Sequence, residues 1–151
     1  MRIHTVIIIA CGILLSCNSS EKKNDLSILN VSEDNERPEN PDKDTSMSNG
    51  QEVYMNFCMS CHLPNGQGVP KVYPPLAKSD YLMTKRVASI KAIKYGLAGK
   101  IEVNDVVYNG NMSALGLDDE EIADVMNYIT NSWGNTNDTL ITAEEVSRID
   151  E

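Results

Sequence analysis

The chain has 151 residues, 41% of them hydrophobic, and its 22 acidic and 13 basic residues give a formal net charge of −9 at pH 7. This acidity disfavours nucleic acid as a partner, because the phosphate backbone is itself negative. Beyond the N-terminal segment, no stretch approaches the roughly 20 consecutive apolar residues of a membrane-spanning helix.

Residues 1–16 are predicted to be a secretory signal peptide. Arg2 supplies the positive charge, and an apolar run of about ten residues, too short to span a bilayer, ends at the small residue Ser16. Leu14-Leu15-Ser16-Cys17 resembles the lipobox of bacterial lipoproteins, whose cysteine is acylated. We therefore expect an exported lipoprotein, anchored to a membrane through Cys17 and facing the periplasm or the cell exterior. The alternative is an ordinary signal peptide with an incidental cysteine.

Residues 17–46 are predicted to be a lipidated N-terminus and a flexible tether. Between residues 18 and 46, eight acidic and four basic residues mix with Asn, Ser and two prolines, Pro38 and Pro41. This composition lacks the apolar surface that would offset the entropy lost on folding. We expect a solvated linker that lets an anchored domain search for partners, although a passive spacer fits the sequence equally well.

A Cys-x-x-Cys-His motif follows, formed by Cys58, Cys61 and His62. This spacing is typical of c-type haem attachment. Two cysteines three residues apart lie on one side of a helical turn, so both sulfurs can add to the two vinyl groups on one porphyrin edge. The adjacent imidazole can then ligate the iron. The motif predicts one covalent haem c, attached to Cys58 and Cys61, with His62 as an axial ligand.

Two other uses of the motif are weaker. A structural zinc site needs four ligands, and no second cysteine pair follows. A thiol–disulfide enzyme would place the motif in a βαβ unit, whereas a helical pattern precedes it here. The remaining cysteines, Cys11 and Cys17, belong to the export segment, so no cysteine needs a disulfide partner.

The folded unit is expected to span residues 47–137 and to be mostly α-helical. A first helix over 49–60 would turn Val53, Tyr54 and Phe57 inward, and a Gly- and Pro-rich loop would follow over 65–75. The apolar positions Val87, Ile90, Ala92 and Ile93 predict a helix over 84–95, and Gly96 lies at its C-cap position.

The remaining elements follow from alternation and capping. A short β-hairpin is predicted with Asn104-Asp105 at its turn, because apolar residues lie on either side of these two: Ile101, Val103 and Val107. Asp118 and Glu121 form a capping box, which predicts a final core helix. The buried stripe of that helix would be Ile122, Val125, Met126 and Ile129. Residues 138–151 are expected to be a tail, with one short surface helix beginning near Thr142.

The stretch from Gly50 to Asn135 resembles a class I cytochrome c domain. It is similar to the small bacterial monohaem domains found free or fused to copper nitrite reductases and oxidases. The resemblance implies the small cytochrome c fold, in which the first and last helices cross closely. It rests on Gly50, Tyr54, the Cys58–His62 motif, Gly66-x-Gly68-Val69-Pro70, Tyr73-Pro74-Pro75-Leu76-Ala77, Tyr108-Asn109-Gly110-x-Met112 and the helix from Glu121 to Asn135.

The second axial ligand is predicted to be Met112. His62 is the only histidine left once the signal containing His4 is removed, which excludes a bis-histidine haem and leaves a methionine, a weaker ligand such as Lys or Asn, or an open site. Met112 matches the ligand position of the family. Among the alternatives, Met55 and Met59 lie too near the motif, Met126 belongs to a core stripe, and Met83 lacks support.

Two details of the ligand set stay open. The carbonyl of Pro70, Pro74 or Pro75 is expected to accept a hydrogen bond from His62, because a ligating imidazole needs its other nitrogen held. Ser113 stands where the family commonly has proline, so the loop is less stiff and the iron–sulfur bond more labile.

A six-coordinate haem leaves no open position for a substrate, so we expect an electron-transfer protein and not an enzyme. The expected function is a membrane-anchored one-electron carrier of a respiratory chain, with redox proteins as donor and acceptor. The alternatives are a haem subunit that delivers electrons to an oxidase, nitrite reductase or periplasmic dehydrogenase, and, less favoured, a haem sensor or peroxidase.

Overall fold

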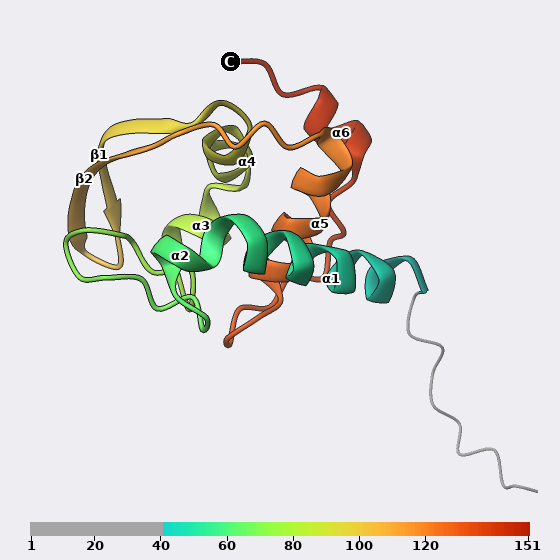
Figure 1. The fold of residues 1–151 in the computed structure, drawn as a ribbon, viewed down its shortest axis with the longest axis horizontal. Coiled ribbons are helices and arrows are strands. Elements are labelled where there is room, and N and C mark those ends of the chain that lie inside the picture. Colours follow the sequence, from blue (N-terminus) through green and yellow to red (C-terminus); the bar gives the residue numbers. More distant parts are fainter. Residues whose placement is uncertain (1–40) are drawn as a thin grey trace, which may run out of the picture. The chain divides into compact units, whose positions relative to one another are not determined.

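The computed structural model describes residues 41–151 (Figure 1). The predicted signal peptide, Cys17 and residues 18–40 of the expected tether lie outside this range. The described residues contain no helix long and apolar enough to cross a bilayer.

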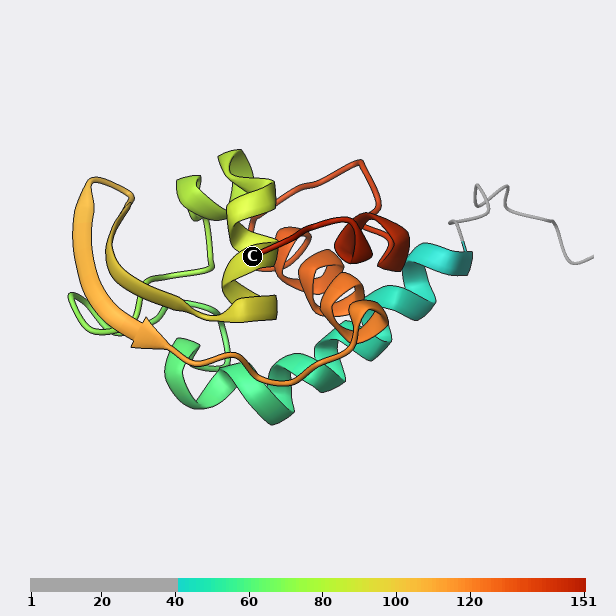
Figure 2. The ribbon, with the colours of Figure 1, turned by 90° about the horizontal axis from the view of Figure 1, so that it is seen from above.

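Helices carry most of the fold, as the sequence predicts. The element order is α1 (Pro41–Val53), η1 (Tyr54–Cys58), α2 (Met59–His62), α3 (Asp80–Thr84), α4 (Arg86–Tyr95), β1 (Leu97–Val103), β2 (Val106–Met112), α5 (Asp119–Thr130) and α6 (Ala143–Ser147). The predicted hairpin is confirmed: β1 and β2 pair antiparallel, with Asn104 and Asp105 in the turn at φ of 51° and 61°. In Figure 2 the β1–β2 hairpin projects to one side of the helices.

The first helix starts earlier than expected. The structure places residues 41–46 in α1, where the composition led us to expect flexible chain. Pro41 stands at the first helical position, where its missing N–H costs nothing. Ser46 is 8% exposed, and its hydroxyl donates to the carboxylate of Asp124 on α5. Contact with α5, and not an apolar stripe of its own, therefore holds this end of the helix.

The predicted burial of Phe57 in the first helical run is wrong. Val53 and Tyr54 are buried as expected, but Phe57 is 44% exposed. The turn Tyr54–Cys58 is a π-helix, whose extra residue per turn breaks the 3.6-residue repeat on which the prediction rested. Cys58 faces the core instead.

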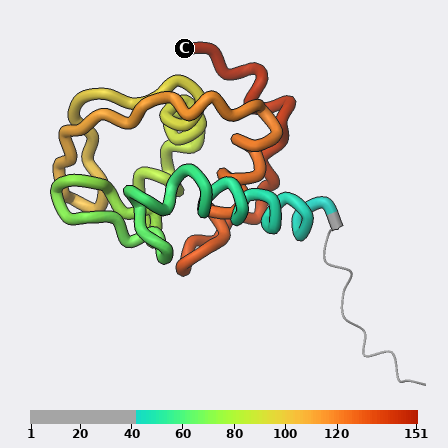
Figure 3. Tube along the Cα trace, viewed as in Figure 1, coloured from blue at the N-terminus to red at the C-terminus, as the bar shows by residue number. Residues whose placement is uncertain are grey.

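The close contact of the first and last helices is confirmed. Gly50 lies against the backbone of α5 at Asp124, and Tyr54 packs on Tyr128 and Trp133, with ring centroids 5.6 and 4.9 Å away. The capping box of Asp118 and Glu121 is present, and all four predicted stripe residues of α5 are buried. The Cα trace in Figure 3 shows α5 crossing α1.

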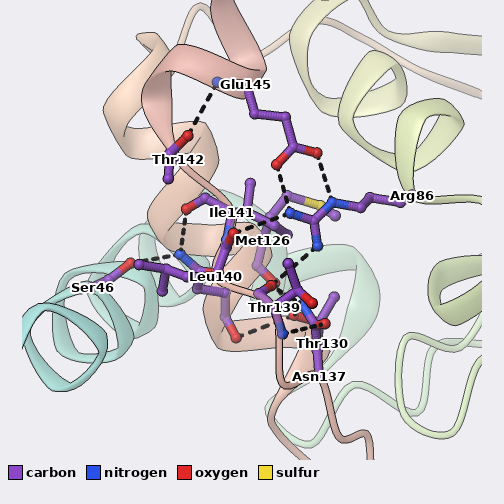
Figure 4. Close-up of polar contacts among 11 residues, drawn as sticks. Ser46, Arg86, Met126, Thr130, Asn137, Thr139, Leu140, Ile141, Thr142 and Glu145 are labelled. Carbon is purple, nitrogen blue, oxygen red and sulfur yellow. Dashed lines mark hydrogen bonds and ion pairs between the residues drawn. The ribbon is translucent and has the colours of Figure 1, made fainter. Parts of the chain in front are cut away.

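The C-terminal segment belongs to the core and does not lie on the surface. Thr142 caps α6 as predicted, but Ile141, Val146 and Ile149 are buried against the main cluster. The Asn127 amide on α5 donates to the Ser46 hydroxyl and to the Ile141 carbonyl, both at 2.9 Å. Figure 4 labels the two acceptor residues, Ser46 and Ile141. The segment after α5 is thus fixed to α5 and α1 together. Val87, expected on the apolar stripe of α4, is 54% exposed.

Candidate cofactor site

The Cys-x-x-Cys-His motif lies at the C-terminal end of the first helical run. Cys58 is buried, Cys61 is half-buried, and neither is in a disulfide. Burial, with a smaller effect from Cys61, raises the pKa of the Cys58 thiol to about 11. A redox-active cysteine has the opposite property, a pKa lowered below the ordinary value. The environment of Cys58 therefore does not suit thiol–disulfide exchange.

The His62 ring is held in one tautomer. Its Nδ1 atom lies 2.9 Å from the carbonyl oxygen of Pro74, so Nδ1–H donates and Nε2 is left with a free lone pair. Among the three proline carbonyls considered from the sequence, Pro74 makes this contact. Burial lowers the pKa of His62, which keeps the imidazole neutral at pH 7. A neutral imidazole is the form that ligates a metal.

Gly68 brings the Pro74 carbonyl to the ring. Its φ is +63°, and a Cβ atom there would lie 2.4 Å from the Tyr73 oxygen and 2.6 Å from the Pro74 oxygen. Its N–H also donates to the His62 carbonyl at 3.0 Å. No larger residue could occupy this position without moving the acceptor of His62.

An apolar cavity lies beside the motif, with about 630 Å³ of space between its atoms, part of it open to solvent. Cofactor sites are typically concave and lined mainly by apolar side chains. Cys58 and His62 line the cavity from the end of the first helix, and Met112 lines it from the end of β2. The other lining residues are Pro74, Pro75, Leu76, Ser79, Tyr81, Leu82, Ser89, Ala92, Ile93, Leu97, Ile101, Val103, Val125, Met126 and Ile129. The sequence therefore brings His62 and Met112 together although they are fifty residues apart.

The donor set fits a c-type haem. A thiol, a neutral imidazole and a thioether line a largely apolar space. In the described residues no cluster of three or more His, Cys, Asp and Glu side chains could hold a metal ion instead. The site therefore suits a flat apolar cofactor that brings its own metal.

The backbone at Met112 is supported by Gly96, the C-cap of α4. A Cβ atom on Gly96 would lie 2.7 Å from the Met112 carbonyl oxygen and 2.9 Å from the Ala114 nitrogen. Gly96 has a φ of +85°, which favours glycine. The end of α4 therefore packs directly against the loop that follows β2.

The other methionines differ in position. Met55 is 54% exposed and Met83 is 37% exposed, and neither lines the cavity. Met126 does line it, from a fully buried position on α5. Met112 also lines a second, more polar hollow next to the cavity, which Cys61 and His62 line as well.

Some lining residues could not be found from the sequence. Ser79, Tyr81 and Ser89 belong to no recognisable motif, and their place in the cavity depends on how α3 and α4 fold back. The hairpin wall had a signal, because Ile101 and Val103 alternate along β1. That alternation predicts a strand but does not indicate that the strand lines a cofactor cavity.

Comparison with known proteins agrees with this geometry. The family model described as cytochrome c matches residues 47–133. Cytochrome c-552 of Thermus thermophilus is 40% identical over 113 residues, which cover 69% of this chain and 76% of that protein. The cytochrome c subunit of the quinone alcohol dehydrogenase of Gluconobacter oxydans is 29% identical over 109 residues. That alignment covers 66% of this chain but only 21% of the subunit. The chain belongs to the cytochrome c family.

Proposed function

We propose that this cytochrome c is a one-electron carrier of a respiratory chain, with a single haem c attached to Cys58 and Cys61 and ligated by His62 and Met112. The observation that carries the proposal is that His62 and Met112 line one apolar cavity directly beside the attachment motif. Two axial ligands leave no coordination position for a substrate, so the protein passes electrons and does not transform a bound molecule.

Family membership gives the chain its covalent haem c, and electron transfer is what its relatives do. The bound haem iron supplies a one-electron redox couple. His62, held by Pro74, provides a fixed and basic nitrogen ligand. The thioether of Met112 is a soft ligand that favours ferrous iron and so raises the reduction potential. The apolar lining would limit the access of water to the iron of a bound haem.

The more polar hollow next to the cavity is the proposed contact surface for redox partners. It is lined by residues of the 71–74 loop and of the hairpin, with Val72 54% and Tyr73 39% exposed. Lys71 is the one charged residue among those lining it. From Thr45 onward, fourteen acidic and eight basic residues give a net charge of −6, which biases encounter toward partners with a basic face.

Membrane attachment is a separate part of the proposal. The lipobox-like sequence ending at Cys17 supports an exported lipoprotein that faces the periplasm or the cell exterior. An acyl anchor at Cys17 would keep the haem domain close to membrane-bound partners.

A dedicated enzyme subunit is the second candidate. The observation that favours it is the similarity to three proteins named as cytochrome c subunits of quinone alcohol dehydrogenases, 29–31% identical over 106–109 residues. This chain spans about a fifth of each of them. Copurification of the cytochrome with a dehydrogenase or oxidase from native membranes would favour the subunit role over a free carrier.

The absorption spectrum of the purified holoprotein tests the carrier proposal. We expect a low-spin spectrum with the red-region methionine band in the ferric form, and no change on adding carbon monoxide to the ferrous form. On a denaturing gel the haem should stay with the polypeptide, because thioether bonds survive denaturant. A high-spin spectrum or rapid carbon monoxide binding would show an open iron site and favour a sensor or peroxidase. Haem that runs free of the polypeptide would contradict attachment at Cys58 and Cys61.

A further inference from the structure

Ser89 carries a buried hydroxyl that no group of the protein satisfies. The residue lies on α4 and is 6% exposed, and its Oγ has no hydrogen-bond partner. Its backbone N–H is already used, donating to the Lys85 carbonyl at 2.9 Å. Leaving such a group without a partner costs about 1–3 kcal/mol. Asn135 has the other unpartnered buried atom in the described residues, but its amide nitrogen is anchored to Leu76 and Ile129.

Ser89 lines the haem cavity, and the polar groups of that cavity are clustered. Apart from the motif residues and the methionines, the polar side chains lining the cavity are Ser79, Tyr81 and Ser89. All three lie between residues 79 and 89, in α3 and the first turns of α4 or directly before them. No lysine or arginine lines this cavity. The part of the cavity wall formed by residues 79–89 therefore presents hydroxyl groups, and no lysine or arginine side chain lines it.

A c-type haem presents few groups that a hydroxyl could bind. Its polar substituents are two propionates, which leave the macrocycle on the edge opposite the two vinyl groups. Attachment to Cys58 and Cys61 fixes the vinyl edge at the first helix. The propionate edge is then the edge remote from that helix.

The sulfur of Met112 is the competing acceptor, and its position argues against it. Gly96, at the end of α4, is the residue that contacts the Met112 backbone. Ser89 is seven residues earlier on the same helix, about 10 Å away along its axis. The Ser89 hydroxyl is thus near the opposite end of α4 from the proposed ligand.

We propose that the Ser89 hydroxyl donates a hydrogen bond to a haem propionate and so positions the cofactor and raises its reduction potential. With no lysine or arginine among the lining residues, the hydroxyl is a neutral donor that offsets part of the carboxylate's charge. Removing the donor leaves more negative charge near the iron, which favours the ferric state. This inference rests on the covalent haem and not on the carrier role or the membrane anchor.

Ser89→Ala and Ser89→Thr in the full-length holoprotein test the proposal, with Ser147→Ala as the matched control. The hydroxyl of Ser147 donates to the Glu144 carbonyl on α6, outside the cavity. The measurements are the propionate bending mode in the resonance Raman spectrum, the midpoint potential and the methionine band. We expect Ser89→Ala to lower the Raman frequency and the potential while the methionine band is unchanged. Ser89→Thr, which restores a hydroxyl, and Ser147→Ala should both match wild type.

Each other outcome overturns the proposal. A change in the methionine band with an unchanged propionate mode would place the hydroxyl on the Met112 sulfur. No change in either would show that the hydroxyl is satisfied within the protein or by water. If Ser89→Ala yields no holoprotein, the wild type can be measured in H₂O and D₂O. A propionate mode that does not shift between them would contradict a hydrogen bond from an exchangeable donor. A failed carrier test, with an open iron site and no methionine band, would still leave the propionate mode and the midpoint potential to test the Ser89 hydrogen bond.

Discussion

A Cβ atom on Gly50 would lie 2.0 Å from the carbonyl oxygen of Asp124, closer than any side chain is tolerated. This contact sets the distance between α1, which leads into the attachment motif, and α5, which contributes five residues to the buried core. The next neighbour of that Cβ would be the Asp124 carbonyl carbon at 2.5 Å, so the obstruction is backbone and cannot rotate away.

Gly50→Ala should therefore destabilise the holoprotein, although alanine is the better helix former by up to about 1 kcal/mol. Overpacking at a rigid contact costs about 1–3 kcal/mol, and the helix propensity of alanine offsets part of this, so we expect a net loss of about 2 kcal/mol or less. Chemical unfolding followed by tryptophan fluorescence measures it. Gly110→Ala is the matched control, because the nearest atom to its new Cβ would be the Val72 oxygen at 3.9 Å. Equal stability of the two variants would contradict the contact.

Met112→Ala should leave the haem attached but convert ferric iron from low spin to a high-spin or water-ligated form. The reduction potential should fall, because loss of the soft sulfur costs ferrous iron more than ferric. The red-region methionine band should disappear. Met126→Ala is the demanding control, since Met126 also lines the cavity. The band should survive in Met126→Ala and in Met83→Ala. Its survival in Met112→Ala would mean that another residue is the ligand.

The loop after the ligand offers a graded test of the same bond. Ser113 follows Met112, and proline there would fix φ and stiffen the loop. We expect added imidazole to displace the methionine of the ferric wild type more readily than that of Ser113→Pro. Titration followed at the methionine band gives the two apparent affinities. If the variant is displaced more easily, backbone stiffness at Ser113 does not protect the bond.

Glu145→Gln should reduce stability by up to about 1 kcal/mol at neutral pH. Glu145 on α6 accepts two hydrogen bonds from the Arg86 guanidinium at 2.6 and 2.5 Å, and Arg86 also binds the Thr139 and Leu140 carbonyls (Figure 4). Hydrogen bonding and charge from Arg86 lower the pKa of Glu145. A lowered pKa in the folded state stabilises above the unfolded pKa, about 4.3, and this contribution is lost on further acidification.

Thermal melts of the wild type and the variant should therefore differ at pH 7 and converge as the pH falls below about 4. Glu144→Gln provides the comparison, because the neighbouring Glu144 pairs with Arg148 with both side chains about three-quarters exposed. We expect no measurable change in that variant. A difference between wild type and Glu145→Gln that persists in acid would point to lost packing instead of lost charge.

Cys17→Ala should move the protein from the membrane to the soluble fraction without changing its haem spectrum. The proposed anchor and the haem domain are separate parts of the chain, so loss of one should not perturb the other. Cys11→Ala, a substitution within the same export segment, should stay membrane-bound. Salt-washed membranes that still retain Cys17→Ala would exclude acylation at this residue as the anchor.

The sequence predicted those parts of the fold that have a local signature. Helix α5 could be predicted in full, because the Asp118–Glu121 capping box and the four-residue apolar stripe are encoded within one segment. The start of α1 could not be predicted from the sequence. Pro41 is a residue typical of linkers, and Ser46 is held in the helix by hydrogen bonds with Asp124 and Asn127, some eighty residues away. Burial of α6 depends in the same way on a surface formed by other elements.

The same holds for the candidate site: features with a local sequence signature could be predicted, and features that depend on distant residues could not. The motif, Gly68 and Met112 stand in recognisable spacings, and the structure brings His62 and Met112 to one cavity. The choice of Pro74 among three prolines required the backbone turn at Gly68. No feature of the sequence predicts that Ser89 lines the cavity, because a single serine on a helix cannot be told from other polar residues until its neighbours are known.

The π-helical turn Tyr54–Cys58 has a consequence for any attempt to graft this attachment motif onto another scaffold. One extra residue in a turn rotates everything after it by about 100° relative to an uninterrupted α-helix. Gly50 and Tyr54 are locked to α5, whereas Cys58 must face the cavity, and the wide turn reconciles these two directions. In a regular α-helix of the same residues, the Cys58 thiol would point in a different direction around the helix axis. Deleting one residue between 54 and 57 removes the extra residue of the wide turn, so a regular α-helix should then direct Cys58 to the cavity with the α1–α5 crossing intact.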